Sequence, residues 1–241
     1  DAYVSGIRAS CYLTEPNVSA LTAKYWQGTD LRCMAAASLS KTKELGCVGA
    51  IAIPELITSI NAFMLGARSV DPEIEMSVVW VNSWFDPASE QEATKALISQ
   101  GVDVVFSNAQ DTPAVIAVAE EAGVYAFNLN SSMAAYAPSK YLGVVGTDWG
   151  PHFLRLVEGH LTGTFEGENF WLGMEDDVVY TADWNADIPP DMIAQIEAKQ
   201  AAILAGSFTV FQGPLIDQAG TERHGAAVAR TERDGEVLDT I

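Results

Sequence analysis

Basic residues and long apolar runs are scarce in this sequence. Its 241 residues include 13 Lys and Arg against 32 Asp and Glu, a formal net charge of −19. A protein that binds nucleic acid must neutralise phosphates with Lys and Arg, so we expect no nucleic-acid partner. No run reaches about 18 apolar residues, the length that predicts a transmembrane helix, and the chain opens at Asp1 without a signal-peptide pattern. We therefore expect no membrane span in this chain.

Motifs for covalent or metal chemistry are also missing. The sequence contains no G-x-S-x-G, G-x-x-x-x-G-K, G-x-G-x-x-G or H-E-x-x-H pattern. Cys11, Cys33 and Cys47 lack zinc or redox spacings and are expected to be buried thiols. The three histidines are too scattered to form a ligand set, and the acidic triplet Glu175–Asp177 is expected to be a solvated turn. We expect no catalytic residue, no metal and no cofactor.

The middle of the chain alternates short apolar runs with amphipathic runs, which is typical of parallel strands joined by crossover helices. The predicted strands are Cys47–Ile53, Ser77–Asn82, Val102–Asn108, Val124–Asn130 and Tyr141–Thr147. The predicted helices begin near prolines and end near glycines: Pro54–Ala67, Pro87–Gly101, Pro113–Gly123, Pro151–Gly163 and Pro190–Ala205, the last with Leu204 facing inward. We also expect Asp86 to cap the second of these helices. The pattern predicts an α/β fold with a buried parallel sheet.

The first 50 residues predict fewer elements. They contain one plausible strand near Val4–Tyr12 and one long helix from about Val18 to Leu39. Two strands are marginal by themselves. We therefore expect that further N-terminal strands precede this sequence or that a neighbouring chain supplies them.

The ligand-binding residues of an open parallel sheet lie beyond the carboxyl ends of its strands. The candidates at these ends are Trp84, Asn108, Asp111, Asn130, Thr147 and Trp149. An Asn amide donates and accepts hydrogen bonds, and an indole offers a flat face for stacking, so the set suits a planar, uncharged ligand with a polar edge. The alternative is structural, because Asn is common in turns and an indole can also pack at a rim.

Three segments carry a family resemblance. GAIAIPELITSINAFMLGARSVDPEIEMSVVWVNSWFDPASEQEA, SNAQDTPAV and VVGTDWGPHF resemble the basic membrane protein family of bacterial solute-binding lipoproteins, from about Pro16 to Gln218. The resemblance implies a type I periplasmic-binding-protein fold, in which two α/β lobes with parallel sheets close around a cleft. It also implies a lipid-anchored receptor, in the periplasm or on the outer face of the cytoplasmic membrane, that delivers purine nucleosides or nucleobases to an ABC permease.

The same resemblance divides the chain. Residues 1–52 correspond to a remnant of the N-terminal lobe, 53–146 to the C-terminal lobe, 147–167 to a return segment and 168–241 to the completion of the C-terminal lobe with a polar tail. Family members carry roughly a hundred further residues before this point and extend a little beyond Gly235–Leu238. We therefore expect a fragment with an incomplete N-terminal lobe.

The resemblance assigns roles at single positions. Asn130 stands where the family has an aspartate, and Thr147 stands where nucleoside-binding members have Lys and a closer branch has Trp. Trp84 keeps an aromatic residue at a Phe position, while Asp111 and Trp149 match the closer branch. The two departures leave the ligand's identity open.

The leading hypothesis is a receptor that binds a purine and releases it unchanged. Trp84 or Trp149 would stack on the ring, and Asn108, Asp111, Asn130 and Thr147 would pair with its edge. One alternative is a nucleoside hydrolase or transferase with Asp86 or Asp111 as the acid or base. Another is a ligand-sensing domain of a signalling protein.

Overall fold

The computed structural model describes residues 4–7, 17–217 and 220–224. A six-stranded sheet, here called the large sheet, has the order β4-β3-β5-β6-β7-β9. All its pairings are parallel except β7 with β9, which is antiparallel. Its strands are β3 (Glu44–Gly49), β4 (Glu75–Trp80), β5 (Val104–Asn108), β6 (Tyr125–Asn130), β7 (Tyr141–Thr147) and β9 (Val179–Ala182).

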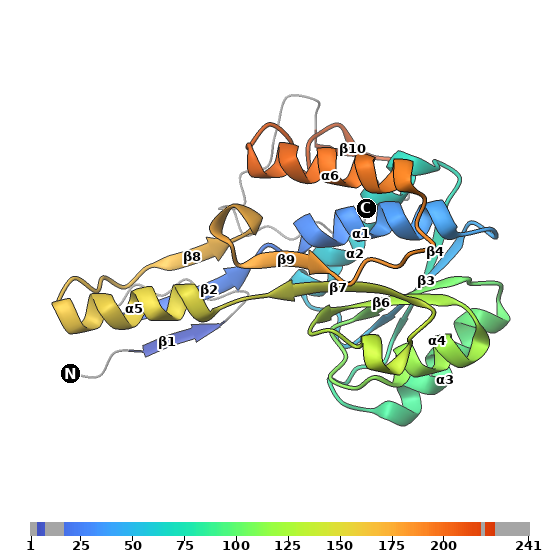
Figure 1. Cartoon of the computed structure of the whole chain (residues 1–241), viewed down its shortest axis with the longest axis horizontal. Helices are drawn as coiled ribbons and strands as arrows, with labels where there is room; N and C mark the ends of the chain where they lie inside the picture. Colours follow the sequence, from blue (N-terminus) through green and yellow to red (C-terminus); the bar gives the residue numbers. More distant parts are fainter. Residues whose placement is uncertain (1–3, 8–16, 218–219, 225–241) are drawn as a thin grey trace.

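Helices cover both faces of the large sheet (Figure 1). One face packs against α1 (Tyr25–Leu39), α2 (Pro54–Val70) and α6 (Pro190–Leu204), and the other against α3 (Pro87–Ser99) and α4 (Ala114–Ala122). On the first face, the rings of Phe63, Phe106 and Phe127 stack, with centroids 4.5 Å apart for Phe106 and Phe127. Burying strands on both faces is the reason that their sequences are near-continuous apolar runs.

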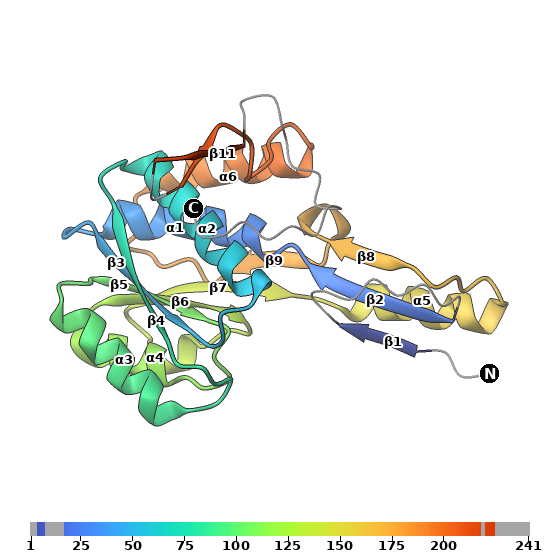
Figure 2. The same cartoon turned by 180° about the vertical axis from the view of Figure 1, so that it is seen from behind.

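A second, smaller sheet extends away from this body. It has the order β1-β2-β8, all parallel, with β1 (Val4–Ile7), β2 (Val18–Ala23) and β8 (Asn169–Leu172). Helix α5 (Gly150–Thr162) lies alongside it (Figure 2). The remaining elements are the short helices η1 (Ala134–Tyr136) and η2 (Met174–Asp176) and the antiparallel pair β10 (Leu215–Ile216) and β11 (Glu222–His224).

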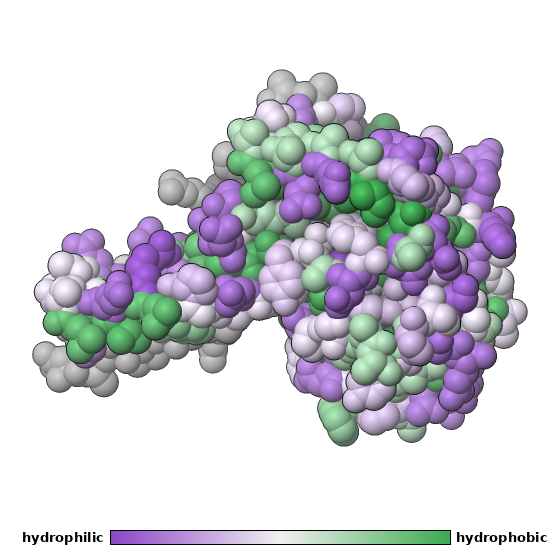
Figure 3. Space-filling view, in the orientation of Figure 1, coloured by the Kyte–Doolittle hydropathy of each residue, from purple (hydrophilic) through white to green (hydrophobic). Residues whose placement is uncertain are grey.

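The outer face of α5 is apolar. Leu154, Val157 and Leu161 are 65%, 54% and 77% exposed, and Phe153 is 36% exposed. These positions recur at helical spacing and form one stripe, which Figure 3 shows as an apolar patch on the extension. Among the described residues, no other element packs against this stripe.

Two sequence predictions are wrong. The helix expected from Val18 to Leu39 begins only at Tyr25, because residues 18–23 form β2 between β1 and β8. The partner strand β8 lies about 150 positions away in the sequence, and pairing with it overrides the local pattern. Leu204 was expected to face inward but is 49% exposed, at the last residue of α6.

Most of the other predictions are confirmed with shifted ends. Strand β7 has the predicted bounds, whereas β3 ends at Gly49 and β4 at Trp80, earlier than expected. The Asp86 carboxylate accepts a hydrogen bond from Ser89 N at 3.1 Å and caps α3. Cys33 and Cys47 are buried as expected. Cys11 and the second half of the predicted first strand lie outside the described residues.

The predicted division of the chain differs from the sheets. Residues 1–52 contribute β1 and β2 to the small sheet but α1 and β3 to the large one, and β8 lies beyond the predicted return segment yet pairs with β2. Among the helices that the structure describes, none is both long and apolar enough to cross a bilayer.

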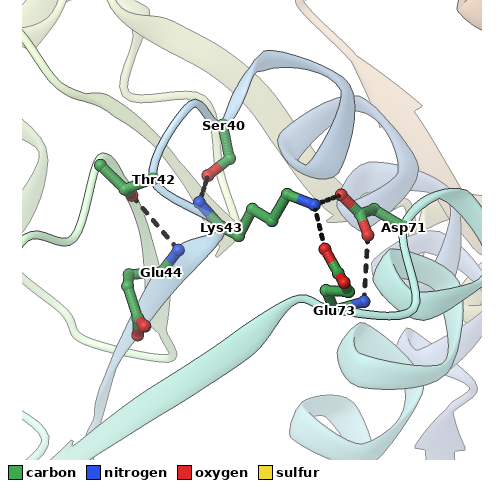
Figure 4. A network of polar contacts seen from close by, with 6 residues as sticks. All are labelled: Ser40, Thr42, Lys43, Glu44, Asp71 and Glu73. Atoms are coloured by element: carbon green, nitrogen blue, oxygen red, sulfur yellow. Dashed lines mark hydrogen bonds and ion pairs between the residues drawn. The ribbon is translucent and has the colours of Figure 1, made fainter.

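A polar network connects the loops at the amino edge of the large sheet, the edge where its parallel strands begin (Figure 4). Lys43, just before β3, contacts Asp71 at 2.9 Å and Glu73 at 2.6 Å, both just before β4. Hydrogen bonds from Lys43 to Glu73 and Asp71 raise the pKa of the ammonium to about 12. Asp103, before β5, accepts hydrogen bonds from Ser40 Oγ at 2.6 Å and Lys41 N at 2.6 Å. This edge is therefore built to hold strand starts together.

Candidate functional site

The opposite, carboxyl edge collects most of the predicted site residues. In the order β4-β3-β5, the crossover from β3 to β4 runs in one direction across the sheet, and the next crossover, from β4 to β5, runs back past β3 in the other direction. Such a reversal opens a crevice at the carboxyl ends of the two strands, where ligands of doubly wound sheets bind. Helix α2 begins at this edge after β3, and α1 begins near it, since the Tyr25 hydroxyl pairs with Thr147 at the end of β7.

Two loops meet directly above the end of β3. Asp111 N, after β5, donates to the carbonyl of Trp84, after β4, at 2.9 Å. Ser83 N and Asn108 O both bond to the backbone of Ala50, at 3.1 and 3.2 Å. The structure thus brings together Trp84, which is 40% exposed, and the exposed Asp111.

A buried carboxylate supports these two loops. Glu90, in the first turns of α3, is 0% exposed and accepts hydrogen bonds from Thr112 Oγ1 and from Asp86 N at 3.2 Å. Burial raises the pKa of Glu90, although the hydrogen bond from Thr112 opposes the shift. Because Thr112 follows Asp111 and Asp86 follows the Trp84 loop, Glu90 fixes both sides of this contact.

Asn108 points into the protein. Its side chain is fully buried and its Nδ2 donates to the carbonyl of Leu56, in the first turn of α2, at 3.1 Å. Asn108 lies two residues after Phe106 and therefore faces the same side of the sheet. In this structure its amide holds the start of α2 in place.

Asn130 is exposed at the end of β6, with φ of 78°. Asn tolerates this left-handed conformation better than most residues. Its neighbour Asn128 is buried, donates to Ser131 O at 2.8 Å and accepts from the Tyr141 hydroxyl at 2.5 Å. This pairing orders the turn and leaves the Asn130 side chain at the surface.

Thr147 is the last residue of β7, and Trp149 lies two residues beyond it. Both are half-buried. Burial raises the pKa of Tyr25, and the hydrogen bond that its hydroxyl oxygen accepts from Thr147 partly offsets this. The Trp149 indole packs against the apolar core, with its ring centroid 6.5 Å from that of Phe153. Trp149 is therefore more enclosed than Trp84.

Sequence reasoning missed two residues at this edge, Tyr25 and Glu55. Glu55 follows Pro54 in the first turn of α2 and is half-buried, and its charge acts on Tyr25. Burial raises the pKa of Glu55. The sequence signal for Glu55 is its position after β3, the first strand of the parallel part of the large sheet. The predicted strand extends to Ile53, directly before the predicted helix at Pro54, so the sequence pattern leaves no loop there, whereas β3 ends at Gly49.

The chain has two bodies, the large sheet with its covering helices and the small sheet with α5. Three neighbouring connections join them: β2 to α1, β7 to α5 and β8 to β9. Lys24 N donates to Leu172 O at 2.8 Å, and Asp148 N donates to Val178 O at 2.8 Å. Glu175 accepts from Lys24 at 2.6 Å and from Gln27 at 2.9 Å. Although burial acts in the other direction, these bonds lower the pKa of Glu175. The carboxyl edge lies directly beside this junction.

A buried arginine braces the same region. Arg32 of α1 is 0% exposed and donates to the carbonyls of Leu142 (2.7 Å), Val144 (2.9 Å) and Ala182, between β7 and β9. Its guanidinium lies 3.6 Å from the centroid of the Trp184 ring. Burial lowers the pKa of Arg32 to about 9. Its donors are used inside the protein and do not reach the crevice.

No group of three or more His, Cys, Asp or Glu side chains in the described part of the chain is arranged to hold a metal ion. The candidates fall into groups along the carboxyl edge. The loops of Trp84 and Asp111 are in contact, and Thr147 and Trp149 lie at the end of β7, near Tyr25. Asn130 is exposed at the end of β6, which lies between β5 and β7, and Asn108 is buried at the end of β5.

Comparisons with known proteins agree with this architecture. A purine-binding protein of Brucella abortus is 39% identical over 214 residues, covering 89% of this chain and 61% of that protein. TsgA13 of Haloferax volcanii, which its name provisionally assigns to glucose binding in an ABC transporter, is 33% identical, covering 89% of this chain and 54% of that protein. The chain therefore spans less than two thirds of the length of either relative.

The fold is also found in solved structures. An ABC transporter solute-binding protein of Aeropyrum pernix K1 superposes with a TM-score of 0.76 at 16% identity, covering 87% of this chain and 71% of that one. This likeness confirms the expected α/β fold of the periplasmic-binding-protein type. The family model described as ABC transporter substrate-binding protein PnrA-like matches residues 1–207. The chain thus belongs to the Bmp family of PnrA-like ABC transporter substrate-binding proteins.

Proposed function

We propose that this chain is part of the solute receptor of an ABC importer and that it binds a purine nucleobase or nucleoside without converting it. The observation that carries the proposal is the contact between Asp111 N and Trp84 O, which brings together over the end of β3 the two loops that carry the partly exposed Trp84 and the exposed Asp111. The family and the purine-binding relative support the same class of ligand.

The proposed binding combines stacking with polar pairing. An indole stacked on a base contributes about 1–3 kcal/mol, and each hydrogen bond to the ligand's edge contributes about 0.5–1.5 kcal/mol. At the upper end of these ranges, Trp84 with Asp111, Asn130 and Thr147 contributes about 7.5 kcal/mol, which corresponds to a dissociation constant of about a few micromolar. Trp149 is a second stacking candidate, and the buried Asn108 contributes by holding α2.

The three connections between the two bodies suit a closing motion around the ligand. They lie side by side and are tied by backbone hydrogen bonds, so the two bodies can rotate about one narrow junction. In the proposed cycle, the closed receptor presents the purine to an ABC permease on the outer side of the cytoplasmic membrane. A lipid anchor in the full-length protein would keep the receptor there.

Calorimetric titration of the full-length protein with adenine, guanine, hypoxanthine and their nucleosides tests the proposal. We expect micromolar or tighter binding to at least one of them, with no release of free base from adenosine or inosine. Glucose is the contrasting ligand, because the name of the Haloferax relative points to it. Binding of glucose with no binding of any purine would refute the purine assignment, and base release would refute the receptor role.

A further inference from the structure

We infer that Glu55 determines which ligands the crevice accepts, by taking a hydrogen bond from an N–H group of the bound heterocycle. The inference rests on the proposed function and assigns a role that the site residues found from the sequence do not fill. Its chemical consequence is a preference for uncharged or cationic rings that carry N–H donors over ligands that carry phosphate.

The position of Glu55 is central in the crevice. It lies in the first turn of α2, immediately after the loop that follows β3, and β3 runs between β4 and β5. The contact between Trp84 and Asp111 crosses the end of this same strand. The hydrogen bond from Asn108 Nδ2 to Leu56 O, at 3.1 Å, fixes the turn that carries Glu55.

The carboxylate of Glu55 is half-buried yet has no donor from the described residues. Burial is the whole cause of its raised pKa, with no hydrogen bond to oppose the shift. Other carboxylates nearby are occupied, since Asp86 accepts from Ser89 N and Glu175 accepts from Lys24 and Gln27. A ligand N–H would supply the bond that Glu55 lacks, and hydrogen bonds to charged groups are among the stronger ones.

The surroundings of Glu55 favour a donor and disfavour an anion. The charge of Glu55 acts on Tyr25, whose hydroxyl pairs with Thr147. Three cations on or next to α1 and α6 are paired elsewhere: Lys24 pairs with Glu175, Arg32 donates to backbone carbonyls and Lys199 pairs with Asp30 at 2.6 Å. A phosphate at this place would face Glu55 and Asp111 without a counter-ion.

A double-mutant cycle between protein and ligand tests the inference. The full-length wild-type protein and Glu55→Gln are titrated with adenine, with 9-methyladenine, which lacks the N9–H, and with purine, which lacks the exocyclic amine. We expect Glu55→Gln to weaken adenine binding about tenfold or more. Deletion of the donor that meets Glu55 then costs the wild type about tenfold and the variant much less. A structural role of Glu55 would weaken all three ligands equally.

The control is Glu92→Gln, which removes one exposed carboxylate from α3, away from the crevice. Thermal unfolding of each variant checks that the fold is kept, and Glu55→Asp replaces Glu55→Gln if the latter does not fold. Equal affinity of wild type and Glu55→Gln for adenine, or no coupling to either donor, overturns the inference alone. Absence of binding of any purine to the wild type overturns both the proposed function and the inference.

Discussion

The two edges of the large sheet use the same residue types in opposite ways. At the amino edge, the carboxylates of Asp71, Asp103 and Glu120 accept hydrogen bonds from neighbouring loops, among them Lys43 Nζ to Asp71, Lys41 N to Asp103 and Lys140 N to Glu120. At the carboxyl edge, Glu55 has no described donor and Trp84 is 40% exposed. An edge whose polar groups are satisfied internally offers a ligand little, so the comparison supports the proposed ligand site at the other edge.

The pKa values follow the same division. The hydrogen bond from Lys43 lowers the pKa of Asp71, whereas burial raises the pKa of Glu55 and of Glu90. Asp86 is an exception, because its carboxylate accepts a hydrogen bond from Ser89 N at the start of α3 and this bond lowers its pKa. At the carboxyl edge, Asp86 therefore caps a helix and Glu90 supports two loops, while Glu55 is left without a donor from the described residues.

The largest effect on stability and binding is predicted for Glu90→Ala, at the carboxyl edge. The change leaves Thr112 Oγ1 and Asp86 N without their acceptor in a fully buried place. We expect a loss of about 2–4 kcal/mol in the free energy of unfolding and weaker purine binding, because the Trp84 and Asp111 loops lose their support. Urea unfolding and calorimetry measure the two effects, and a variant with unchanged stability and affinity would contradict the role.

Trp84→Ala is expected to act on binding alone. Loss of the stacked indole should cost about 1–3 kcal/mol of binding free energy, with the free energy of unfolding changed by less than about 0.5 kcal/mol because the ring is partly exposed. Tyr136→Ala is the matched control, since Tyr136 is 54% exposed on η1 and is not among the proposed ligand residues. If both variants bind adenine as the wild type does, stacking on Trp84 is excluded.

Asp103→Ala should give the reverse result at the amino edge. Asp103 accepts from Ser40 Oγ and from Lys41 N and Thr42 N. Removing the carboxylate should lower the free energy of unfolding by about 1–2 kcal/mol, since water can replace part of the lost bonding. Purine affinity should stay within about twofold of the wild type. A large loss of affinity without loss of stability would erase the distinction between the edges.

Most helices and strands could be predicted from the sequence because a few adjacent residues decide where each one begins and ends. Gly123 and Gly163 end α4 and α5 in the left-handed conformation, and Asp86 caps α3, each decided by a few adjacent residues. Strand β2 was misread because its pairing partners β1 and β8 are not adjacent to it in the sequence. The local pattern of apolar residues does not show which distant strands will pair.

The site was readable only in part. The rule for parallel sheets placed Trp84 and Asp111 at one edge, and their loops are in contact. It could not show that Asn108 faces the buried side with Phe106, because the direction of a side chain depends on the phase of the strand. It also overlooked Tyr25 and Glu55, which reach the edge from helix starts once α1 and α2 have packed on the sheet.

The smallest predicted effect is a difference of sign in pH dependence between Glu90→Gln and Glu120→Gln. Burial raises the pKa of Glu90, so its contribution to stability falls as pH rises above the unfolded value of about 4.3. Burial also acts to raise the pKa of Glu120, but hydrogen bonds from Ser139 and Lys140 outweigh it and lower the pKa, so its contribution is lost as pH falls below about 4.3. Urea unfolding from about pH 3 to pH 7 should therefore give stability differences from wild type with opposite slopes. Slopes of the same sign would show that the two edges do not differ in how they hold their carboxylates.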